Sequence, residues 1–131
     1  DILNSEKIIV IKNDILKHLT NKSGLNTYSS IIDLKPSKIK DLCFSIGAEI
    51  KNAFLILVIK DNNKVYCSCF ISKDIASSKK LNASEIISEL SSYINGKGGG
   101  QPFYATCAGD NVSGIDKLIL EAKKLQNQLQ K

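Results

Sequence analysis

Apolar runs and period-two alternation predict the strands of a sheet in this chain. Residues 53–59 (AFLILVI) are the most hydrophobic stretch, which is typical of a central strand buried on both faces. Residues 64–72 alternate, so we expect Cys67 and Cys69 to point into the core. The polar residues at 61–63 have the turn chemistry of an antiparallel hairpin between these two strands. Two further strands are expected, at residues 7–12 and 28–34.

Apolar residues that recur every three or four positions predict helices between these strands. Ser37 is expected to cap a helix that runs to about residue 50. Asn82 followed by Glu85 fits a capping arrangement for a helix that ends at Gly96. The other expected helices are residues 14–22, ended by Gly24, and a last helix capped by Asp110 or Ser113. Together the elements predict a single α/β domain over residues 1–131, with helices packed on a mixed sheet of about four to five strands.

The charge of the chain changes the list of partners to consider. The net charge is +5, and every basic residue other than His18 is a lysine. Lysine suits phosphate contact but lacks the planar fork that reads guanine, so a nucleic acid would be bound through its backbone. Lysines that only keep the domain in solution remain an equal alternative.

Several classes of function are not expected from this composition. No apolar run approaches the roughly 20 residues of a membrane span, and the four cysteines have no metal-ligand spacing. We therefore expect a cytoplasmic protein with reduced thiols, no bound metal and no membrane partner. His18 stands alone, without a paired acid or nucleophile, so no catalytic residue is predicted. Because the chain begins at Asp1 and contains no methionine, we interpret it as a piece of a longer protein.

The glycine-rich segment 95–109 (NGKGGGQPFYATCAG) is the main candidate for a binding site. Closely spaced glycines bare their backbone N–H groups, which bind anions in other proteins. A helix end followed by a packing turn explains the same glycines without a ligand. The spacing matches no P-loop or dinucleotide fingerprint, so no cofactor is predicted. Lysines spaced by seven on the last helix would extend a phosphate track. The predicted nucleic-acid-binding residues are Gly96, Lys97, Gly98, Gly99, Gly100, Gln101, Lys117 and Lys124.

The segment GKGGGQPFYATCAG, between the helix SEIISELSSYIN and a terminal amphipathic helix, resembles the C-terminal globular domain of the alanyl-tRNA synthetase family, of the DHHA1 superfamily. The resemblance implies a DHHA1-like fold and a tRNA-binding module without a catalytic site. Such a module contacts the outer corner of tRNA and helps aminoacylation and editing domains elsewhere in the parent to act on one tRNA. Gln101 and Phe103 depart from the usual arginine and aspartate of the family, which shifts phosphate contact toward Lys97 and the helix lysines.

Two other functions remain open at this point. DHHA1 domains also form the substrate-binding half of DHH phosphoesterases, which act on short nucleotides, but Gln101 stands where those enzymes usually have histidine. Alternatively, the last helix pairs between subunits in a homodimer, through Leu118, Leu125 and Leu129.

Overall fold

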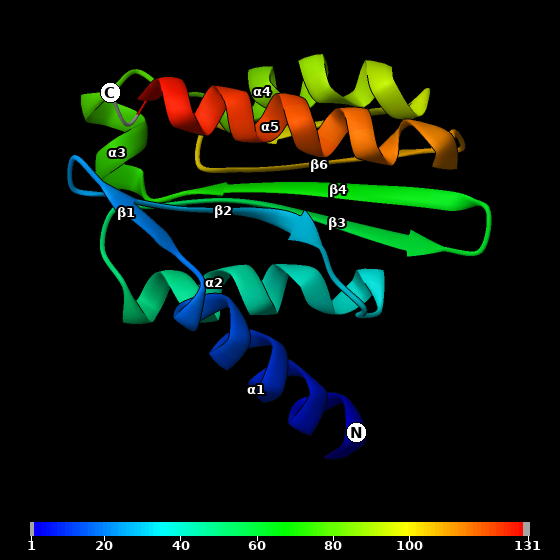
Figure 1. Cartoon of the computed structure of the whole chain (residues 1–131), viewed down its shortest axis with the longest axis horizontal. Coiled ribbons are helices and arrows are strands. Elements are labelled where there is room, and N and C mark those ends of the chain that lie inside the picture. Colours follow the sequence, from blue (N-terminus) through cyan, green and yellow to red (C-terminus); the bar gives the residue numbers. More distant parts are fainter. Residues whose placement is uncertain (1, 130–131) are drawn as a thin grey trace.

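A mixed sheet forms the centre of the computed structural model, which describes residues 2–129 (Figure 1). Within these residues the sheet has six strands in the order β1-β2-β3-β4-β6-β5, and only β2 and β3 pair in parallel. The strands are β1 (Thr20–Lys22), β2 (Leu25–Ile31), β3 (Ala53–Asp61), β4 (Lys64–Ile71), β5 (Lys97–Gln101) and β6 (Tyr104–Gly109). The helices are α1 (Ile2–Lys17), α2 (Ile39–Glu49), α3 (Lys73–Ser78), α4 (Ala83–Ser91) and α5 (Ile115–Leu129). Single 3₁₀ turns occupy Pro36–Lys38, Ser92–Ile94 and Val112–Gly114. The predicted fold class is confirmed, with one strand more than expected.

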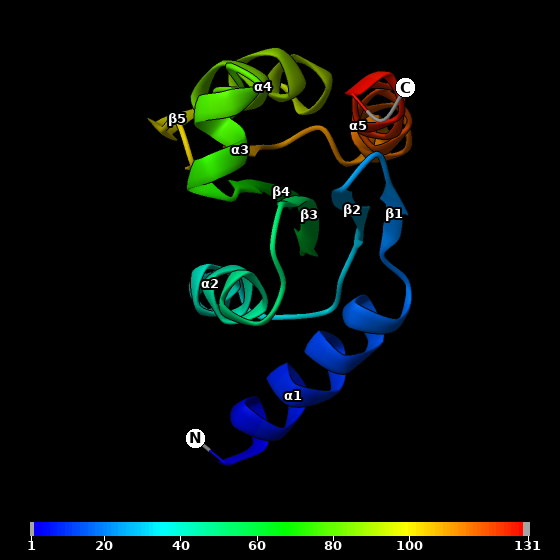
Figure 2. The same cartoon turned by 90° about the vertical axis from the view of Figure 1, so that its left-hand side faces the viewer.

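Helices cover both faces of the sheet. The helices α4 and α5 lie on one face, and α1 and α2 lie on the other (Figure 2). The central strand β3 explains the long apolar run, because alternate residues of it enter two separate cores. Phe54, Ile56 and Val58 pack toward α4 and α5, whereas Leu55 and Leu57 pack toward α2. Each residue of this run is therefore buried.

The N-terminal segment was predicted wrongly. Residues 7–12 were expected to form a strand, but they lie in the middle of α1. Ile8, Ile11 and Ile15 recur at helical spacing on the face that packs against the core on the α2 side of the sheet. This spacing determines the structure of the segment, although its β-branched composition favours a strand. The predicted helix 14–22 ends at Lys17, and Thr20–Lys22 is instead β1, which turns through Gly24 with a φ of 77° into β2.

The glycine-rich segment also differs from the expectation. It is not a loop between two helices, because β5 and β6 form an antiparallel hairpin that closes through Pro102 and Phe103. The preceding helix does not run to Gly96: α4 ends at Ser91, and a 3₁₀ turn leads to Asn95 with a φ of 60°. Glycine is generally disfavoured in strands, so the composition of residues 97–101 alone does not predict a strand there.

The expected helix caps have mixed outcomes. Asn82 is confirmed as the cap of α4, because its side chain accepts from the backbone N–H of Ser84 at 2.9 Å and of Glu85 at 3.4 Å. Ser37 makes no such bond, since it lies inside the 3₁₀ turn that leads into α2. Asp110 and Ser113 do not cap α5: the Asp110 carboxylate accepts from Asn95, and the Ser113 hydroxyl donates to Asn111.

The cysteines behave as predicted for small apolar residues. Cys67 and Cys69 are buried in the core under α4, and the four cysteines are unbridged. Burial raises the pKa of Cys43 to about 12, and it raises the pKa of Cys69 well above its usual range. Among residues 2–129, no helix is long and apolar enough to cross a lipid bilayer.

Candidate functional site

The glycine-rich segment forms one edge of the sheet. β5 pairs with β6 through the register Lys97↔Ala108, Gly99↔Thr106 and Gln101↔Tyr104, and its other side has no neighbouring strand in the described part of the chain. All five residues of β5 are at least partly accessible. Half of the backbone groups in an edge strand point away from the sheet, so β5 presents main-chain amides to solvent, interleaved with carbonyl groups.

Two glycines of β5 are required by the close approach of the β6 backbone. A Cβ at Gly98 would lie 2.5 Å from Cys107 Cα and against the Thr106 carbonyl oxygen, and a Cβ at Gly100 would lie 2.5 Å from the Tyr104 oxygen. Gly99 is different, because the nearest atom to a Cβ there is Ser84 Oγ at 3.7 Å. Gly98 and Gly100 are therefore explained by packing, and neither has a positive φ.

A groove runs along the α2 face of the sheet beside β5, and we call it the tyrosine groove. Its volume is about 640 Å³, within the range of ligand sites in proteins. It lies between the start of α2 and strands β4, β6 and β5. The lining residues are Pro36, Ser37, Ile39, Lys40, Tyr66, Ser68, Lys97, Gly98, Gly99, Tyr104, Thr106, Cys107 and Ala108.

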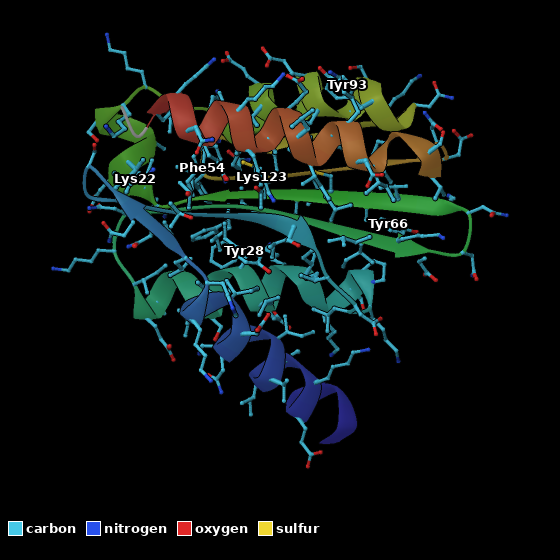
Figure 3. The ribbon with its side chains drawn as sticks, viewed as in Figure 1. Lys22, Tyr28, Phe54, Tyr66, Tyr93 and Lys123 are labelled. Carbon is cyan, nitrogen blue, oxygen red and sulfur yellow. The ribbon has the colours of Figure 1, made fainter. Side chains whose placement is uncertain are left out.

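Cross-strand pairing places the polar and aromatic side chains of the groove on one face. Tyr66 pairs with Ala108, and Ser68 pairs with Thr106. Tyr66 projects to the α2 side of the sheet (Figure 3), and by strand alternation Ser68, Thr106 and Ala108 face the same side. Tyr104 lies two residues before Thr106 in β6 and therefore faces the same side of the sheet. Its ring lies 5.5 Å from that of Phe44, and Phe44 in turn contacts Phe70 edge-on at 5.2 Å. The floor of the groove is thus a partly accessible aromatic surface.

Two lysines border this surface. Lys97 extends from β5, and Lys40 extends from the first turn of α2, with its Nζ atom 5.9 Å from the ring centroids of both Phe44 and Tyr104. Among residues 6–129 neither lysine forms an ion pair, and no carboxylate of these residues lines the groove. The site therefore combines free positive charge with aromatic faces.

The Tyr104 hydroxyl stays protonated at neutral pH. Burial raises the pKa of Tyr104 to about 12, and a hydrogen bond with Ser68 opposes that shift only in part. The tyrosine therefore offers the groove a neutral ring with a hydrogen-bonding hydroxyl, and it adds no negative charge.

The predicted binding residues do not all meet in one place. Lys97, Gly98 and Gly99 line the tyrosine groove, whereas Lys117 and Lys124 lie on α5, which covers the opposite face of the sheet. Both α5 lysines contact the Glu121 carboxylate, at 3.1 Å and 3.4 Å. The hydrogen bond from Lys117, assisted by Lys124, holds the pKa of Glu121 below its usual range. The expected track from the glycines to the helix lysines is therefore interrupted.

The remaining predicted residues lie at the borders of the glycine strand. Gln101 is exposed at the hairpin end of β5, and Gly96 precedes the strand, where its N–H donates to the Ser91 carbonyl at 2.8 Å. Sequence reasoning missed Lys40, Tyr66 and Tyr104. The alternation of Tyr66 with the buried Cys67 signals that this tyrosine faces the other side of the sheet, but only the strand order brings it beside β5.

The structure offers little for metal chemistry in its described part. No group of three or more histidine, cysteine, aspartate or glutamate side chains comes together there in a metal-binding arrangement. Cys67 and Cys107 face each other across β4 and β6. The hydrogen bond between them is the main cause, and burial the second cause, that raises the pKa of Cys67 well above its usual range. That thiol is therefore protonated at neutral pH.

The chain is similar to known proteins over most of its length. The DHHA1 domain family model matches residues 27–128, which include β5, β6 and the whole tyrosine groove. An alanine–tRNA ligase of Christiangramia forsetii is 37% identical over 121 residues, covering 92% of this chain but 14% of the ligase. The chain thus spans about one seventh of the length of the curated relatives it matches.

Solved structures share the fold at low sequence identity. The C-Ala domain of Aquifex aeolicus alanyl-tRNA synthetase superposes with a TM-score of 0.71 at 19% identity, covering 81% of this chain and 95% of that domain. A pGpG-specific phosphodiesterase from Vibrio cholerae has a TM-score of 0.54 at 14% identity, covering 98% of this chain and 41% of the enzyme. The match over residues 27–128 shows that this chain belongs to the DHHA1 domain family.

Proposed function

We propose that this chain is the tRNA-binding C-terminal domain of an alanine–tRNA ligase and that the tyrosine groove is its RNA contact. The similarity to alanine–tRNA ligases over 92% of the chain supports the parent, and the likeness to a C-Ala domain supports the fold. In this proposal the catalytic domains lie elsewhere in the parent. The domain contacts the outer corner of tRNA and helps aminoacylation and editing act on the same molecule.

The single observation that carries the RNA contact is that two lysines without ion pairs lie beside an aromatic floor. Lys40 and Lys97 border the groove without any lining carboxylate, so their charge is available to phosphate groups. Lysine contacts phosphates without reading sequence, which suits recognition of a folded RNA by its shape.

Tyr66 and Tyr104 supply the second part of the interaction. Unstacked bases in RNA loops bind to aromatic side chains, and each such contact contributes about 1–3 kcal/mol. Both tyrosines are only half-buried, and both line the groove together with Lys40 and Lys97. A nucleotide in the groove would stack its base on this surface while its phosphate meets Lys97 or Lys40.

The glycine strand has a supporting role in this proposal. Gly98 and Gly100 let β5 lie close against β6, and Gly98 and Gly99 line the groove. Amides on the open edge of β5 add hydrogen-bond donors near the phosphates. Lys117 and Lys124 remain candidate contacts, but Glu121 offsets part of their charge.

The salt dependence of tRNA binding tests this assignment. Removing one lysine that binds a phosphate reduces the slope of log K against log salt by about 0.7–0.9. We expect the double variant Lys40→Gln/Lys97→Gln to lower the slope by about 1.4–1.8. A Lys117→Gln/Lys124→Gln variant should lower it by clearly less. The measurement is a titration of labelled tRNA at several salt concentrations.

Two exposed lysines away from the groove provide the matched control. Lys60 follows the buried part of β3 and Lys79 follows α3, so Lys60→Gln/Lys79→Gln removes the same charge at another place. If this control lowers the slope as much as the groove variant, the binding is a general effect of net charge. The tyrosine groove would then lose its assignment.

The fold likeness to a phosphodiesterase keeps one alternative function in view. In that reading the groove is the substrate-binding half of a DHH phosphoesterase for short nucleotides. Gln101 stands at the position where a histidine was expected for that class, and it lies at the exposed end of β5. Hydrolysis of a dinucleotide by the parent protein would favour this alternative over the tRNA ligase.

The proposed pairing of α5 between subunits has less support. Leu118 is fully buried inside the domain, and Leu125 and Leu129 pack against the same core, so these leucines are already occupied. Leu120 is a large apolar residue that α5 exposes.

A further inference from the structure

A polar cavity lies at the edge of the sheet opposite to β5. It has a volume of about 330 Å³ and sits between the end of α1, strands β1 and β2, and α5. Since β1 and β2 come first and β5 last in the strand order, the whole sheet separates this cavity from the tyrosine groove. We call it the β2-edge cavity, and its lining includes Ser29, Lys123, Gln126 and Asn127.

The first observation is that part of β2 has no partner on this side. β1 is so short that it covers only Leu25, Asn26 and Thr27. Asn26 and Ile32 donate their N–H groups to carbonyls at the β3 side of the strand, at 2.8 Å each. By the alternation of a strand, Ser29 then turns its N–H and C=O toward the open edge, beside the cavity.

The second observation is a buried hydroxyl without a partner. Ser29 is 7% exposed and lines the cavity, yet no group among residues 6–129 forms a hydrogen bond with its Oγ atom. Buried polar atoms are nearly always satisfied, and an exception points to a ligand or an ordered water.

The third observation is the orientation of the Gln126 side chain. Gln126 is 3% exposed, and its Nε2 atom donates to the carbonyls of Tyr28 at 3.1 Å and Phe54 at 3.0 Å. Both N–H groups are thus occupied, which fixes the amide and leaves Oε1 as an acceptor that no other group in the described part of the chain uses.

The fourth observation is charge. Lys123 lines the cavity from α5 and, among the described residues, makes no ion pair. Its neighbour Lys124 is paired with Glu121. No carboxylate lines the cavity, although His18 at its rim contacts Asp14 at 3.3 Å. The cavity therefore favours an anion.

We infer that the β2-edge cavity binds a small phosphorylated ligand of nucleotide size, with its phosphate on Lys123 and a hydroxyl or amino group donating to Gln126 Oε1. The Ser29 hydroxyl and main-chain N–H, with the Asn127 amide, complete the donors around the phosphate. A bare phosphate would leave the Gln126 acceptor and most of the cavity unfilled. The volume is at the lower end of the range of about 300–1,000 Å³ found for small-molecule sites.

The ligand has two sources, a free mononucleotide or one nucleotide unit of an RNA chain. Titrations of the ¹⁵N-labelled chain with adenosine 5′-monophosphate, inorganic phosphate, adenosine and a short single-stranded RNA distinguish them. We expect adenosine 5′-monophosphate to shift the amide signals of Ser29, Ser30 and Asn127 and to bind more tightly than phosphate or adenosine. Tighter binding of the RNA at the same amides would identify the polymer as the source.

Variants connect the binding to the named atoms. Lys123→Gln should weaken binding of the nucleotide about tenfold, as expected when one charge-assisted hydrogen bond is removed. Ser29→Ala should weaken it about threefold while leaving the melting temperature of the free protein unchanged or higher, since it removes an unsatisfied buried group. Lys60→Gln, a lysine on another part of the surface, should bind as the parent does.

Three results would overturn the inference, the last two of which concern where the nucleotide binds. One is the absence of any shift at Ser29, Ser30 and Asn127 at millimolar nucleotide. The second is nucleotide binding that Lys123→Gln and Ser29→Ala leave unchanged, and the third is binding that shifts Lys97, Gly98 and Gly99 instead. Failure of tRNA binding at the tyrosine groove would not affect these outcomes, because none of the residues tested lies there.

Discussion

Lysines occur beside the glycine strand and along α5, but the two sets differ in what surrounds them. Lys40 and Lys97 border aromatic rings and no carboxylate. Lys117 and Lys124 share the Glu121 carboxylate on an exposed helix face. The sequence spacing of seven makes the α5 lysines the more regular pattern, yet the unpaired lysines offer more positive potential. In the proposed RNA contact, the availability of a charge is therefore expected to matter more than its periodicity.

The difference also extends to how each set is held. The α5 lysines extend from a helix whose position depends on Leu118, Ala122 and the buried Gln126. The position of Lys97 depends on strand β5. That strand can pair with β6 only because Gly98 and Gly100 allow close contact between the two backbones. A change in β5 should therefore affect the groove and leave the α5 lysines in place.

The largest expected effect comes from Gly98→Ala. The added Cβ meets the Cys107 Cα and the Thr106 carbonyl, and backbone atoms cannot move aside as a flexible side chain does. We expect a loss of about 3 kcal/mol in the free energy of unfolding, together with weaker RNA binding. Urea denaturation measures the first effect.

Gly99→Ala is the matched control for this change. Its Cβ would meet only Ser84 Oγ at 3.7 Å, and the residue has no positive φ. We expect its stability to lie within about 0.5 kcal/mol of the parent, because the smaller entropy of the unfolded chain offsets other losses. Equal destabilisation by both variants would mean that the close approach of β5 to β6 is not what requires glycine.

The regular part of the fold was predictable from the sequence because local pattern and tertiary environment agree there. The run at residues 53–59 became β3, and Asn82 caps α4 as expected. α1 was misassigned because four consecutive β-branched residues hid a helical face, and Ile9 and Val10 remain exposed on the other side. β5 was missed because a glycine strand has no alternation, and its pairing with β6 is decided by tertiary contact.

The candidate site was predictable in smaller measure. The motif located Lys97 and the glycines, since their composition is unusual in any context. Lys40 lies far from them in sequence, and its place beside Tyr104 depends on α2 packing across the sheet. The ion pairs with Glu121 follow from helical spacing, because Lys117 and Lys124 are four residues before and three residues after it. That local signal is present in the sequence.

The second expected effect concerns the aromatic floor of the groove. Tyr104→Ala removes a stacking surface, and we expect tRNA affinity to fall by about 2 kcal/mol, or roughly thirtyfold. Tyr104→Phe keeps the ring and should stay within about twofold of the parent. A filter-binding titration at fixed salt measures both.

Tyr93→Ala serves as the control on the other side of the molecule. Tyr93 (Figure 3) lies in a second groove, between α4 and α5. Glu121 and Lys124 also line this second groove. If its removal weakens tRNA binding more than the removal of Tyr104, the RNA lies on α5, and the ranking of the two sets of lysines is wrong. Thermal melting of both alanine variants separates binding from unfolding.

The smallest expected effect comes from releasing the α5 lysines. Glu121→Gln removes the shared carboxylate, and we expect tRNA affinity to rise about twofold to threefold at low salt, with a steeper salt slope.

The pH dependence has a defined sign. The pKa of Glu121 is lowered in the folded state, so its ion pairs stabilise the fold above the ordinary carboxyl pKa and are lost as the pH falls through the lowered value. Acidification through that range should raise tRNA affinity more in the parent than in Glu121→Gln. Equal affinity of the two proteins at neutral pH would show that these lysines do not face RNA, whereas a rise larger than the decrease caused by Lys40→Gln/Lys97→Gln would move the main contact to α5.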